Sequence, residues 1–220
     1  MSPNRTPQLE AYYAKRAREY ESQVYAKAER QDELAWARDR VPRLFAGRRV
    51  LEVACGTGYW TREIARRAAH VTACDINEPV LEVAREKRLP PRRVRFAKAD
   101  AFAPGPVCDR CDAAFAGFWW SHLRRAEASR WLGVLREALA PGALVGILDN
   151  RYVEGSSTPL SRRDAAGDTW QVRTLLSGET HEVLKNFPTP AELAEAARPH
   201  AREAWLEETA YYWLLVLRLK

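Results

Sequence analysis

Apolar runs alternate with amphipathic segments through the middle of this chain. Five short runs rich in Val, Ala, Leu and Phe have the composition of buried strands, and they cover residues 49–55, 70–75, 93–100, 111–118 and 143–150. The spacing of apolar residues between these runs predicts helices over 59–69, 78–87 and 124–139. Repeated alternation of strand and helix over this core, residues 48–150, predicts a parallel sheet covered by helices on both faces.

Residues 189–220 break this alternation. Thr189, Pro190 and Glu192 have the spacing of a capping box with proline at the first helical position, which predicts the start of a helix. Two strand-like runs follow, 202–209 and the strongly apolar 211–219, separated by little more than a tight turn. Such a pair predicts two antiparallel strands that close the sheet.

Two further segments lie outside the core. Residues 1–47 form a polar, tyrosine-rich arm with helical spacing, and residues 151–188 form an insertion in which Ser177-Gly178 predicts a hairpin turn. We therefore expect a single α/β domain over 1–220. Its sheet is Rossmann-like and doubly wound, mostly parallel with an antiparallel final strand pair, and it carries an N-terminal helical arm and a β-hairpin insertion.

Composition limits the environment and the partners. Of the 220 residues 46% are hydrophobic, yet no apolar run approaches the roughly 18 residues of a membrane span. The start has no apolar segment of the kind that a secretory signal needs, so we expect a cytoplasmic protein. The net charge of +6 comes mainly from Arg residues interleaved with Glu and Asp, as on a solvated surface, so no nucleic-acid partner is expected.

The turn after the first predicted strand carries the clearest candidate chemistry. Residues 55–58 read Cys-Gly-Thr-Gly directly before a helix, and a bare glycine turn there lets a ligand approach the backbone closely. A dinucleotide could bind such a turn, but Thr61 stands where the third glycine of that fingerprint belongs. Glu52 also places a negative charge near the turn, which favours a cationic ligand over a pyrophosphate.

The stretch EVACGTG, residues 52–58, resembles the first motif of class I S-adenosylmethionine-dependent methyltransferases, whose ligand carries an ammonium and a sulfonium group. Three later stretches fit this resemblance in order: HVTACDIN at 70–77, FAKADAF at 96–102 and CDAAFAGFWWSHL at 111–123. The resemblance implies S-adenosylmethionine as the cofactor.

The resemblance also gives particular positions a role. It implies that Asp75 accepts hydrogen bonds from both ribose hydroxyls and that Asp100 accepts one from the adenine amino group. The arm is similar to the lid of small-molecule members of the family, where Tyr13 would close over the methionine end of the cofactor. The cofactor contacts implied in this way are Tyr13, Glu52, Ala54, Gly56, Gly58, Trp60, Asp75, Ile76, Asp100, Ala101 and Phe118.

Aromatic residues follow the fourth predicted strand, where members of the family bind substrate. They suggest a flat or cationic acceptor held by stacking or cation–π contact, although core packing would also explain the tryptophans. His122 is the candidate catalytic base if the accepting atom must lose a proton, and a packed histidine is the alternative. The expected substrate-binding residues are Tyr20, Trp119, Trp120, His122, Asp149, Arg151 and Tyr152.

No metal site is expected. Asp149 and Asn150 partly match the ligands of magnesium-dependent catechol O-methyltransferases, but Gly117 stands near the position of the third ligand. Cys108 and Cys111 have the spacing of a zinc half-site or a redox pair, but no second pair completes a metal set, so we assign them no chemistry.

The predicted function is methyl transfer from S-adenosylmethionine to a small-molecule acceptor, aromatic or cationic, by in-line displacement without a metal. An RNA methyltransferase and a non-catalytic S-adenosylmethionine-binding protein are the alternatives. The lack of an appended RNA-binding module disfavours the first, and the intact set of motifs disfavours the second. The sequence does not indicate which atom of the acceptor is methylated.

Overall fold

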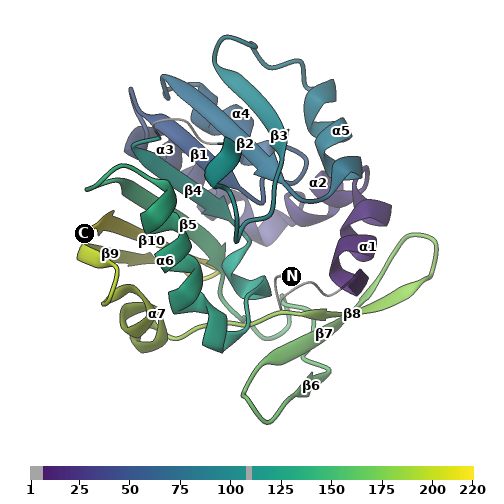
Figure 1. Cartoon of the computed structure of the whole chain (residues 1–220). Helices are drawn as coiled ribbons and strands as arrows, with labels where there is room; N and C mark the ends of the chain where they lie inside the picture. Colours follow the sequence, from purple (N-terminus) through teal and green to yellow (C-terminus); the bar gives the residue numbers. More distant parts are fainter. Residues whose placement is uncertain (1–6, 108–110) are drawn as a thin grey trace.

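The computed structural model describes residues 7–107 and 111–220, which form a central sheet flanked by helices and a small second sheet (Figure 1). The central sheet has the strand order β3-β2-β1-β4-β5-β10-β9. Its strands are β1 (Arg49–Val53), β2 (His70–Asp75), β3 (Val94–Lys98), β4 (Ala113–Gly117), β5 (Leu144–Asn150), β9 (Ala201–Glu208) and β10 (Tyr212–Leu219). The first five are parallel, and β10 runs antiparallel to both β5 and β9. This confirms the Rossmann-like sheet with an antiparallel final pair.

Helices cover both faces of the central sheet because both faces of its inner strands are apolar. In β1, Val50 belongs to a buried cluster with residues of α3, α4 and α5, whereas Leu51 belongs to a second cluster with residues of α6 and α7. The bounds of these helices are α3 (Gln31–Leu44), α4 (Tyr59–Ala65), α5 (Glu78–Glu86), α6 (Ala128–Ala138) and α7 (Pro190–Ala197). The predicted capping box at Thr189 is present at the start of α7.

The helices of the core are shorter than their sequence pattern suggests. The helix expected over 59–69 ends at Ala65, and the one expected over 124–139 begins with a separate 3-10 turn, η4 (Arg125–Glu127). Two further 3-10 turns of the core are η2 (Gly105–Val107) and η3 (Trp120–His122). Helical spacing of apolar residues continues into such turns, so the pattern alone overestimates helix length.

The N-terminal arm divides into two parts with different roles. The helix α3 is part of the core, with Leu34, Ala37 and Val41 fully buried against the sheet. The preceding elements are α1 (Pro7–Arg16), α2 (Tyr20–Val24) and the 3-10 turn η1 (Ala28–Arg30). Figure 1 shows α1 between α5 of the core and β8 of the insertion, both of which it contacts. We refer to residues 7–30 as the lid.

The insertion forms a three-stranded antiparallel sheet with the order β6-β7-β8. Its strands are β6 (Arg162–Arg163), β7 (Thr169–Thr174) and β8 (Thr180–Leu184). The turn between β7 and β8 contains Gly178 with a φ of 87°, a left-handed conformation that glycine adopts without strain. The hairpin predicted at Ser177-Gly178 is therefore confirmed, and β6 extends it by one short strand.

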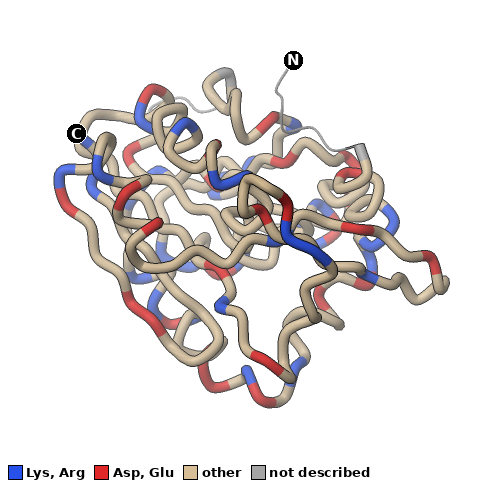
Figure 2. The backbone as a smooth tube through the Cα atoms, turned by 90° about the horizontal axis from the view of Figure 1, so that it is seen from below, with Lys and Arg blue, Asp and Glu red and all other residues tan. Residues whose placement is uncertain are grey.

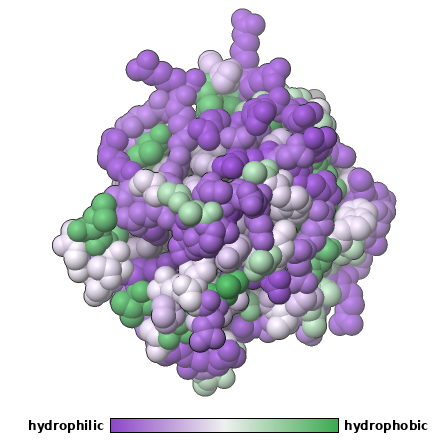
Figure 3. Space-filling view, turned by 180° about the vertical axis from the view of Figure 1, so that it is seen from behind, coloured by the Kyte–Doolittle hydropathy of each residue, from purple (hydrophilic) through white to green (hydrophobic). Residues whose placement is uncertain are grey.

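The surface carries both charge signs throughout. In Figure 2, Lys and Arg segments are interspersed with Asp and Glu segments, and the basic residues do not gather into one stripe in that view. The face shown in Figure 3 is mainly hydrophilic, with small separate apolar areas. Within 7–107 and 111–220, no helix is long and apolar enough to cross a bilayer.

The buried face of α6 should carry a large share of the stability of the core. Leu132 on this helix is fully buried, whereas Leu176 in the hairpin is 76% exposed. We expect Leu132→Ala to lower the free energy of unfolding by about 2–5 kcal/mol, because it removes buried methyl groups and leaves a cavity. Urea unfolding measures this loss. Leu176→Ala is the matched control, and equal losses in the two variants would contradict the assignment of the core.

Candidate active site

The glycine turn adopts the backbone conformation that a closely approaching ligand requires. After β1, the residues Ala54, Gly56 and Gly58 have left-handed φ angles of 51°, 53° and 77°. Gly58 is the N-cap of α4, and a Cβ on it would lie 3.2 Å from the Ala84 Cβ. The turn thus folds tightly against α5 and presents its backbone at the carboxyl end of the sheet.

Asp75 connects this turn to the next strand. One of its carboxylate oxygens accepts a hydrogen bond from the Gly56 N–H at 2.9 Å, and the other accepts one from the Asn77 N–H at 2.9 Å. Each carboxylate oxygen keeps a second lone pair for a ligand. Burial raises the pKa of Asp75 despite these two donors.

A cavity, here called cavity A, opens at this edge of the sheet. Its wall includes the glycine turn, the ends of β2 and β3, the segment after β4, and the lid. Four acidic residues line it, namely Glu10, Glu52, Asp75 and Asp100, and no Lys or Arg is among the described residues that line it. Cavity A is therefore suited to a cationic ligand.

Glu52 is the most deeply buried of these acids. It is 1% exposed, and its Oε2 atom has no hydrogen-bond partner within the described part of the chain. Burial raises the pKa of its carboxyl group to about 8. A buried carboxyl group with an unused oxygen at the wall of cavity A provides the site for a positively charged ligand group.

A second cavity, cavity B, adjoins cavity A. It lies between the lid, the segment after β5 and the insertion sheet. Tyr13, Tyr20, Phe118 and His122 line both cavities and therefore mark the boundary between them. Two ligands, one bound in each cavity, would therefore contact each other beside these four side chains.

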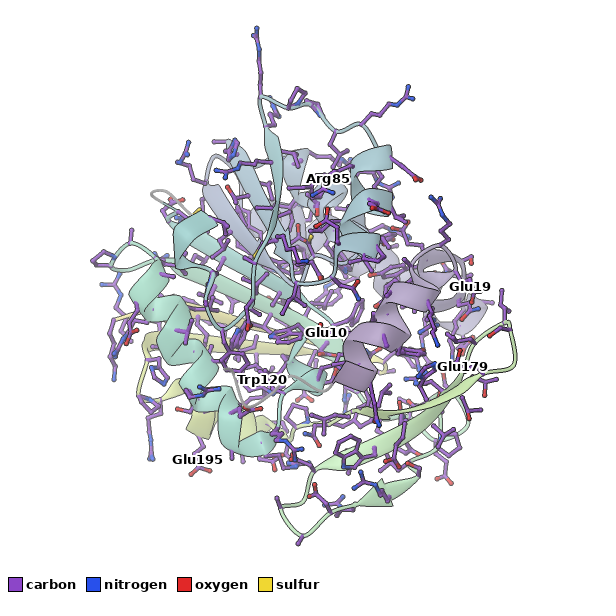
Figure 4. The ribbon with its side chains drawn as sticks, turned by 45° about the vertical axis from the view of Figure 1, so that its right-hand side comes forward. Glu10, Glu19, Arg85, Trp120, Glu179 and Glu195 are labelled. Atoms are coloured by element: carbon purple, nitrogen blue, oxygen red, sulfur yellow. The ribbon has the colours of Figure 1, made fainter. Side chains whose placement is uncertain are left out.

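The lid is fixed to both sides of this boundary. Glu21 accepts hydrogen bonds from the Thr57 hydroxyl of the glycine turn at 2.6 Å and from Lys87 at 2.6 Å. On the other side, Lys15 of α1 pairs with Glu179 of the hairpin at 2.6 Å. Figure 4 shows Glu10 on the part of α1 that faces the central sheet, and Glu179 on the hairpin loop beside the lid.

His122 sits at the boundary in a defined tautomer. Its Nδ1 lies 2.8 Å from the carbonyl oxygen of Leu184, which can only accept, so Nδ1 carries the proton. Its Nε2 is then an acceptor and takes the hydrogen bond of the Tyr13 hydroxyl at 2.8 Å. Burial, assisted by the positive charge of Lys185, lowers the pKa of His122 to about 3. The imidazole is therefore neutral at physiological pH and is a weak base.

Asp149 lies beneath the boundary and not in it. Its carboxylate is fully buried and accepts hydrogen bonds from the Ser121 N–H at 2.8 Å and the Ser121 hydroxyl at 3.0 Å. It also accepts from the Asn150 N–H at 2.7 Å and lies 3.5 Å from Lys185 Nζ. These partners occupy the oxygens that a magnesium ion would need.

The structure places most of the expected cofactor residues around cavity A. Those that line it are Tyr13, Glu52, Ala54, Gly56, Trp60, Asp75, Ile76, Asp100, Ala101 and Phe118. Gly58 lies one step further on, as the N-cap of α4. Among the expected substrate residues, Tyr20 and His122 line both cavities, and Trp119 lines cavity A.

Four expected substrate residues do not line either cavity. Trp120 is buried in the core against Trp131 and Trp213, and in Figure 4 it lies within the body of the molecule. Asp149 supports Ser121, as described above. Arg151 extends along the surface towards Glu208, and Tyr152 is 41% exposed and packs on Phe187. The turn η3 explains why Trp120 is in the core while Trp119 lines cavity A, because the turn directs adjacent side chains to opposite sides.

Sequence reasoning missed five basic residues that line cavity B. They are Arg16, Lys27, Arg30, Arg173 and Lys185. They come from the lid and from the insertion, and no motif marks them. Their only signal in the sequence was the high Arg content, which looks the same as that of a solvated surface. The pair Cys108 and Cys111 is not informative here, since Cys108 lies outside the described residues.

Comparisons with known proteins agree with this geometry. A family model described as "Methyltransferase domain" matches residues 50–142. The chain is 35% identical over 104 residues to a demethylmenaquinone methyltransferase from Clavibacter sepedonicus, covering 47% of this chain and 42% of that protein. It is 30% identical over 135 residues to a malonyl-[acyl-carrier protein] O-methyltransferase from Serratia marcescens, covering 61% and 47%. The chain thus spans less than half the length of these two relatives.

Solved structures extend the likeness to nearly the whole chain. A structure titled "DhpI-SAH complex structure" superposes with a TM-score of 0.75 at 28% identity, covering 97% of this chain and 96% of that one. A second structure, titled "DhpI-SAM-HEP complex", gives a TM-score of 0.75 at 27% identity, covering 98% and 99%. The fold of this chain is therefore shared with these two structures over nearly its whole length.

Together, these comparisons support a class I S-adenosylmethionine-dependent methyltransferase, with S-adenosylmethionine as its cofactor. The residues that line cavity A fit this cofactor independently of the comparisons. The cavity has acidic residues and the unused Glu52 oxygen for the cationic groups of the ligand, and free carboxylate lone pairs at Asp75 for hydroxyl donors.

Cofactor binding should release a proton from Glu52. A cationic ligand stabilises the carboxylate, so it lowers a pKa that starts at about 8, and affinity should rise with pH up to about that value. Calorimetry at pH 7 in buffers of different ionisation enthalpy measures the released proton. Glu52→Gln should abolish this release, and Glu195→Gln on the distant helix α7 is the control. Proton release that survives in Glu52→Gln would contradict the role of Glu52.

Asp75 should contribute strongly to cofactor affinity. Asp75→Ala removes the carboxylate that we expect at the ribose hydroxyls and also the acceptor for the Gly56 N–H. We expect a loss of about 2 kcal/mol in binding S-adenosylmethionine, or roughly 30-fold in the dissociation constant. Calorimetry on the wild type should also show no binding of a nicotinamide dinucleotide. An affinity for the adenosyl ligand that is unchanged in the variant would refute this assignment.

Proposed function

We propose that this protein transfers a methyl group from S-adenosylmethionine to a small-molecule acceptor in cavity B. The observation that carries the proposal is the boundary formed by Tyr13, Tyr20, Phe118 and His122, where the contents of the two cavities meet. Two relatives support it, because one is a demethylmenaquinone methyltransferase and another a malonyl-[acyl-carrier protein] O-methyltransferase.

The residues at the boundary align the reactants and exclude water. The bound cofactor supplies a methyl group on a positively charged sulfur, and its transfer needs a straight approach and a dry site. The lid provides Tyr13 and Tyr20 as walls, and burial raises the pKa of both hydroxyls, so they stay neutral. Tyr25, stacked on Tyr59 with ring centroids 3.7 Å apart, holds the lid on the glycine turn side.

His122 acts in this proposal through Tyr13 and not as a base. Its only bare nitrogen is occupied by the Tyr13 hydroxyl, and its pKa of about 3 makes proton uptake unfavourable. In this proposal His122 is therefore not the catalytic base that the sequence suggested. It is a positioning residue that holds Tyr13 at the boundary. An acceptor that carries no transferable proton suits this arrangement better than a neutral hydroxyl does.

The charges of cavity B argue against a cationic acceptor. Five basic side chains line it, and no Asp or Glu is among the lining residues that the structure describes. The aromatic wall expected from Trp119 and Trp120 is not in cavity B either, where tyrosines and phenylalanines stand instead. Stacking of a flat acceptor on these rings remains compatible with the site.

We propose further that the transfer needs no metal. Asp149, the best metal-ligand candidate in the sequence, is held by Ser121, Asn150 and Lys185. Within the described ranges, no group of three His, Cys, Asp or Glu residues could hold a metal ion. The nucleic-acid alternative has little support, since basic and acidic segments are mixed on the surface in Figure 2.

A transfer assay with labelled S-adenosylmethionine tests these statements together. We expect label in small molecules, unchanged rates with EDTA, and only micromolar or weaker tRNA binding at physiological salt. Activity lost with EDTA and restored by magnesium would refute the metal-free reaction. Label found in tRNA alone would establish the RNA methyltransferase, and cofactor binding without transfer to any acceptor would favour the non-catalytic protein.

A further inference from the structure

The two adjoining cavities have opposite charge. Cavity A is lined by four acidic residues and by no Lys or Arg, whereas cavity B is lined by five basic residues and by no Asp or Glu, within the described part of the chain. A positively charged cofactor explains the acids of cavity A. The basic residues of cavity B require an explanation of their own.

Four of the five basic side chains have only neutral partners. Arg16 donates to the Tyr12 hydroxyl at 2.7 Å and to Gln23 at 2.8 Å, and Arg173 donates to Gln171 at 2.6 Å and to the Thr158 hydroxyl at 2.8 Å. Arg30 donates to the Ser156 hydroxyl at 2.9 Å.

The fourth, Lys27, donates to the Ser156 carbonyl oxygen. None of these four forms an ion pair with a described carboxylate, and the fifth, Lys185, is paired with Asp149. Glu29 offsets part of this charge, since its pKa is lowered by hydrogen bonds and also by Lys27 and Arg30, but it forms no ion pair with either. With five basic residues against Asp149 and Glu29, the cluster still holds more positive than negative charge.

Two of these charges are largely held out of water, whereas Lys27 and Arg173 are half-buried. Arg16 is 8% exposed and Arg30 is 6% exposed. Burial of a cation without a counter-charge is costly, and several like charges in one cavity increase the cost. Their mutual effect is visible in Lys27, because burial and the neighbouring Arg30 both lower its pKa. A bound anion would remove most of this cost.

The arrangement reaches the boundary with cavity A. The charge of Arg173 acts on Tyr13, Tyr20 and His122, which line both cavities. Arg16 lies over the Tyr20 ring at 5.3 Å from its centroid. An anion held by this cluster would therefore stand beside the place where the methyl group is delivered. Arginine is suited to this task, because its planar fork of N–H donors matches carboxylate and phosphate-type oxygens.

We propose that the methyl acceptor is a small oxyanion, a carboxylate or a phosphate- or phosphonate-type group, held in cavity B by Arg16, Arg30 and Arg173. This inference rests on the proposed function and specifies its acceptor. An O–CH₃ bond forms as the S–CH₃ bond breaks, the electron pair of the broken bond stays on sulfur, and no proton moves. The product is a methyl ester, and the weakly basic His122 is no obstacle, since no base is needed.

Anion binding to cavity B can be measured without knowing the biological substrate. Acetate, methylphosphonate and the neutral isostere acetamide are titrated into the protein at constant ionic strength, with and without S-adenosylhomocysteine. We expect saturable binding of at least one anion and none of acetamide. Acetate is a planar oxyanion and methylphosphonate a tetrahedral one. The anion that binds more tightly indicates whether the acceptor is a carboxylate or a phosphate-type group.

The matched variants are Arg173→Gln in cavity B and Arg163→Gln on the exposed strand β6 of the same small sheet. Arg173→Gln should weaken anion binding at least tenfold and leave the affinity for S-adenosylhomocysteine unchanged, whereas Arg163→Gln should change neither. Arg30→Gln provides a second cavity variant if Arg173→Gln does not fold. With labelled S-adenosylmethionine, a carboxylate acceptor should give a methyl ester that loses its label in mild alkali. A phosphate- or phosphonate-type acceptor should give a monomethyl ester that keeps its label there, because the remaining negative charge repels hydroxide.

The possible failures differ from one another. Binding of acetamide as tight as that of the anions, or equal losses in Arg163→Gln and Arg173→Gln, would overturn the oxyanion acceptor while cofactor binding and methyl transfer stand. Label in an alkali-stable amine or ether would do the same. Failure to bind S-adenosylhomocysteine would instead contradict the proposed function. The anion titrations done without S-adenosylhomocysteine would still test the anion site.

Discussion

The parallel pairing of β1 with β2 on one side and β4 on the other is the constraint on which the site depends. Its register sets Val53 beside Cys74 and Glu52 beside Phe115, so three strands end at one edge of the sheet. Only this alignment brings Asp75 to the Gly56 N–H. A shift of one residue would turn Glu52 to the opposite face and separate the glycine turn from its carboxylate.

The lid and the insertion convert this edge into two compartments. The edge supplies three of the four acids of cavity A at or near strand ends, and Glu10 of the lid supplies the fourth. The basic residues of cavity B all come from the lid and the insertion. In the proposed function, the core would bind the cofactor and the added segments would select the acceptor, so that one fold could serve different acceptors.

Residues that line cavity A could be proposed from the sequence because they lie at or near strand ends and within motifs that resemble those of class I methyltransferases. Strand patterns place Glu52, Asp75 and Asp100 at one edge of the sheet, and the resemblance implies their roles. The basic residues of cavity B could not be proposed in this way, because Arg16, Arg30 and Arg173 come from separate segments and look like surface arginines in their local context. Trp119 and Trp120 were equally ambiguous, since a 3-10 turn sends two adjacent rings to different environments.

The hydrogen bond between Tyr13 and His122 joins the lid to the body of the protein at the boundary of the two cavities. Tyr13 and Tyr20 of the lid line both cavity A and cavity B, so a movement of the lid that opens one cavity also changes the other. We therefore expect a substitution that loosens the lid to change access to both cavities together, so that release of cofactor and of product would be coupled.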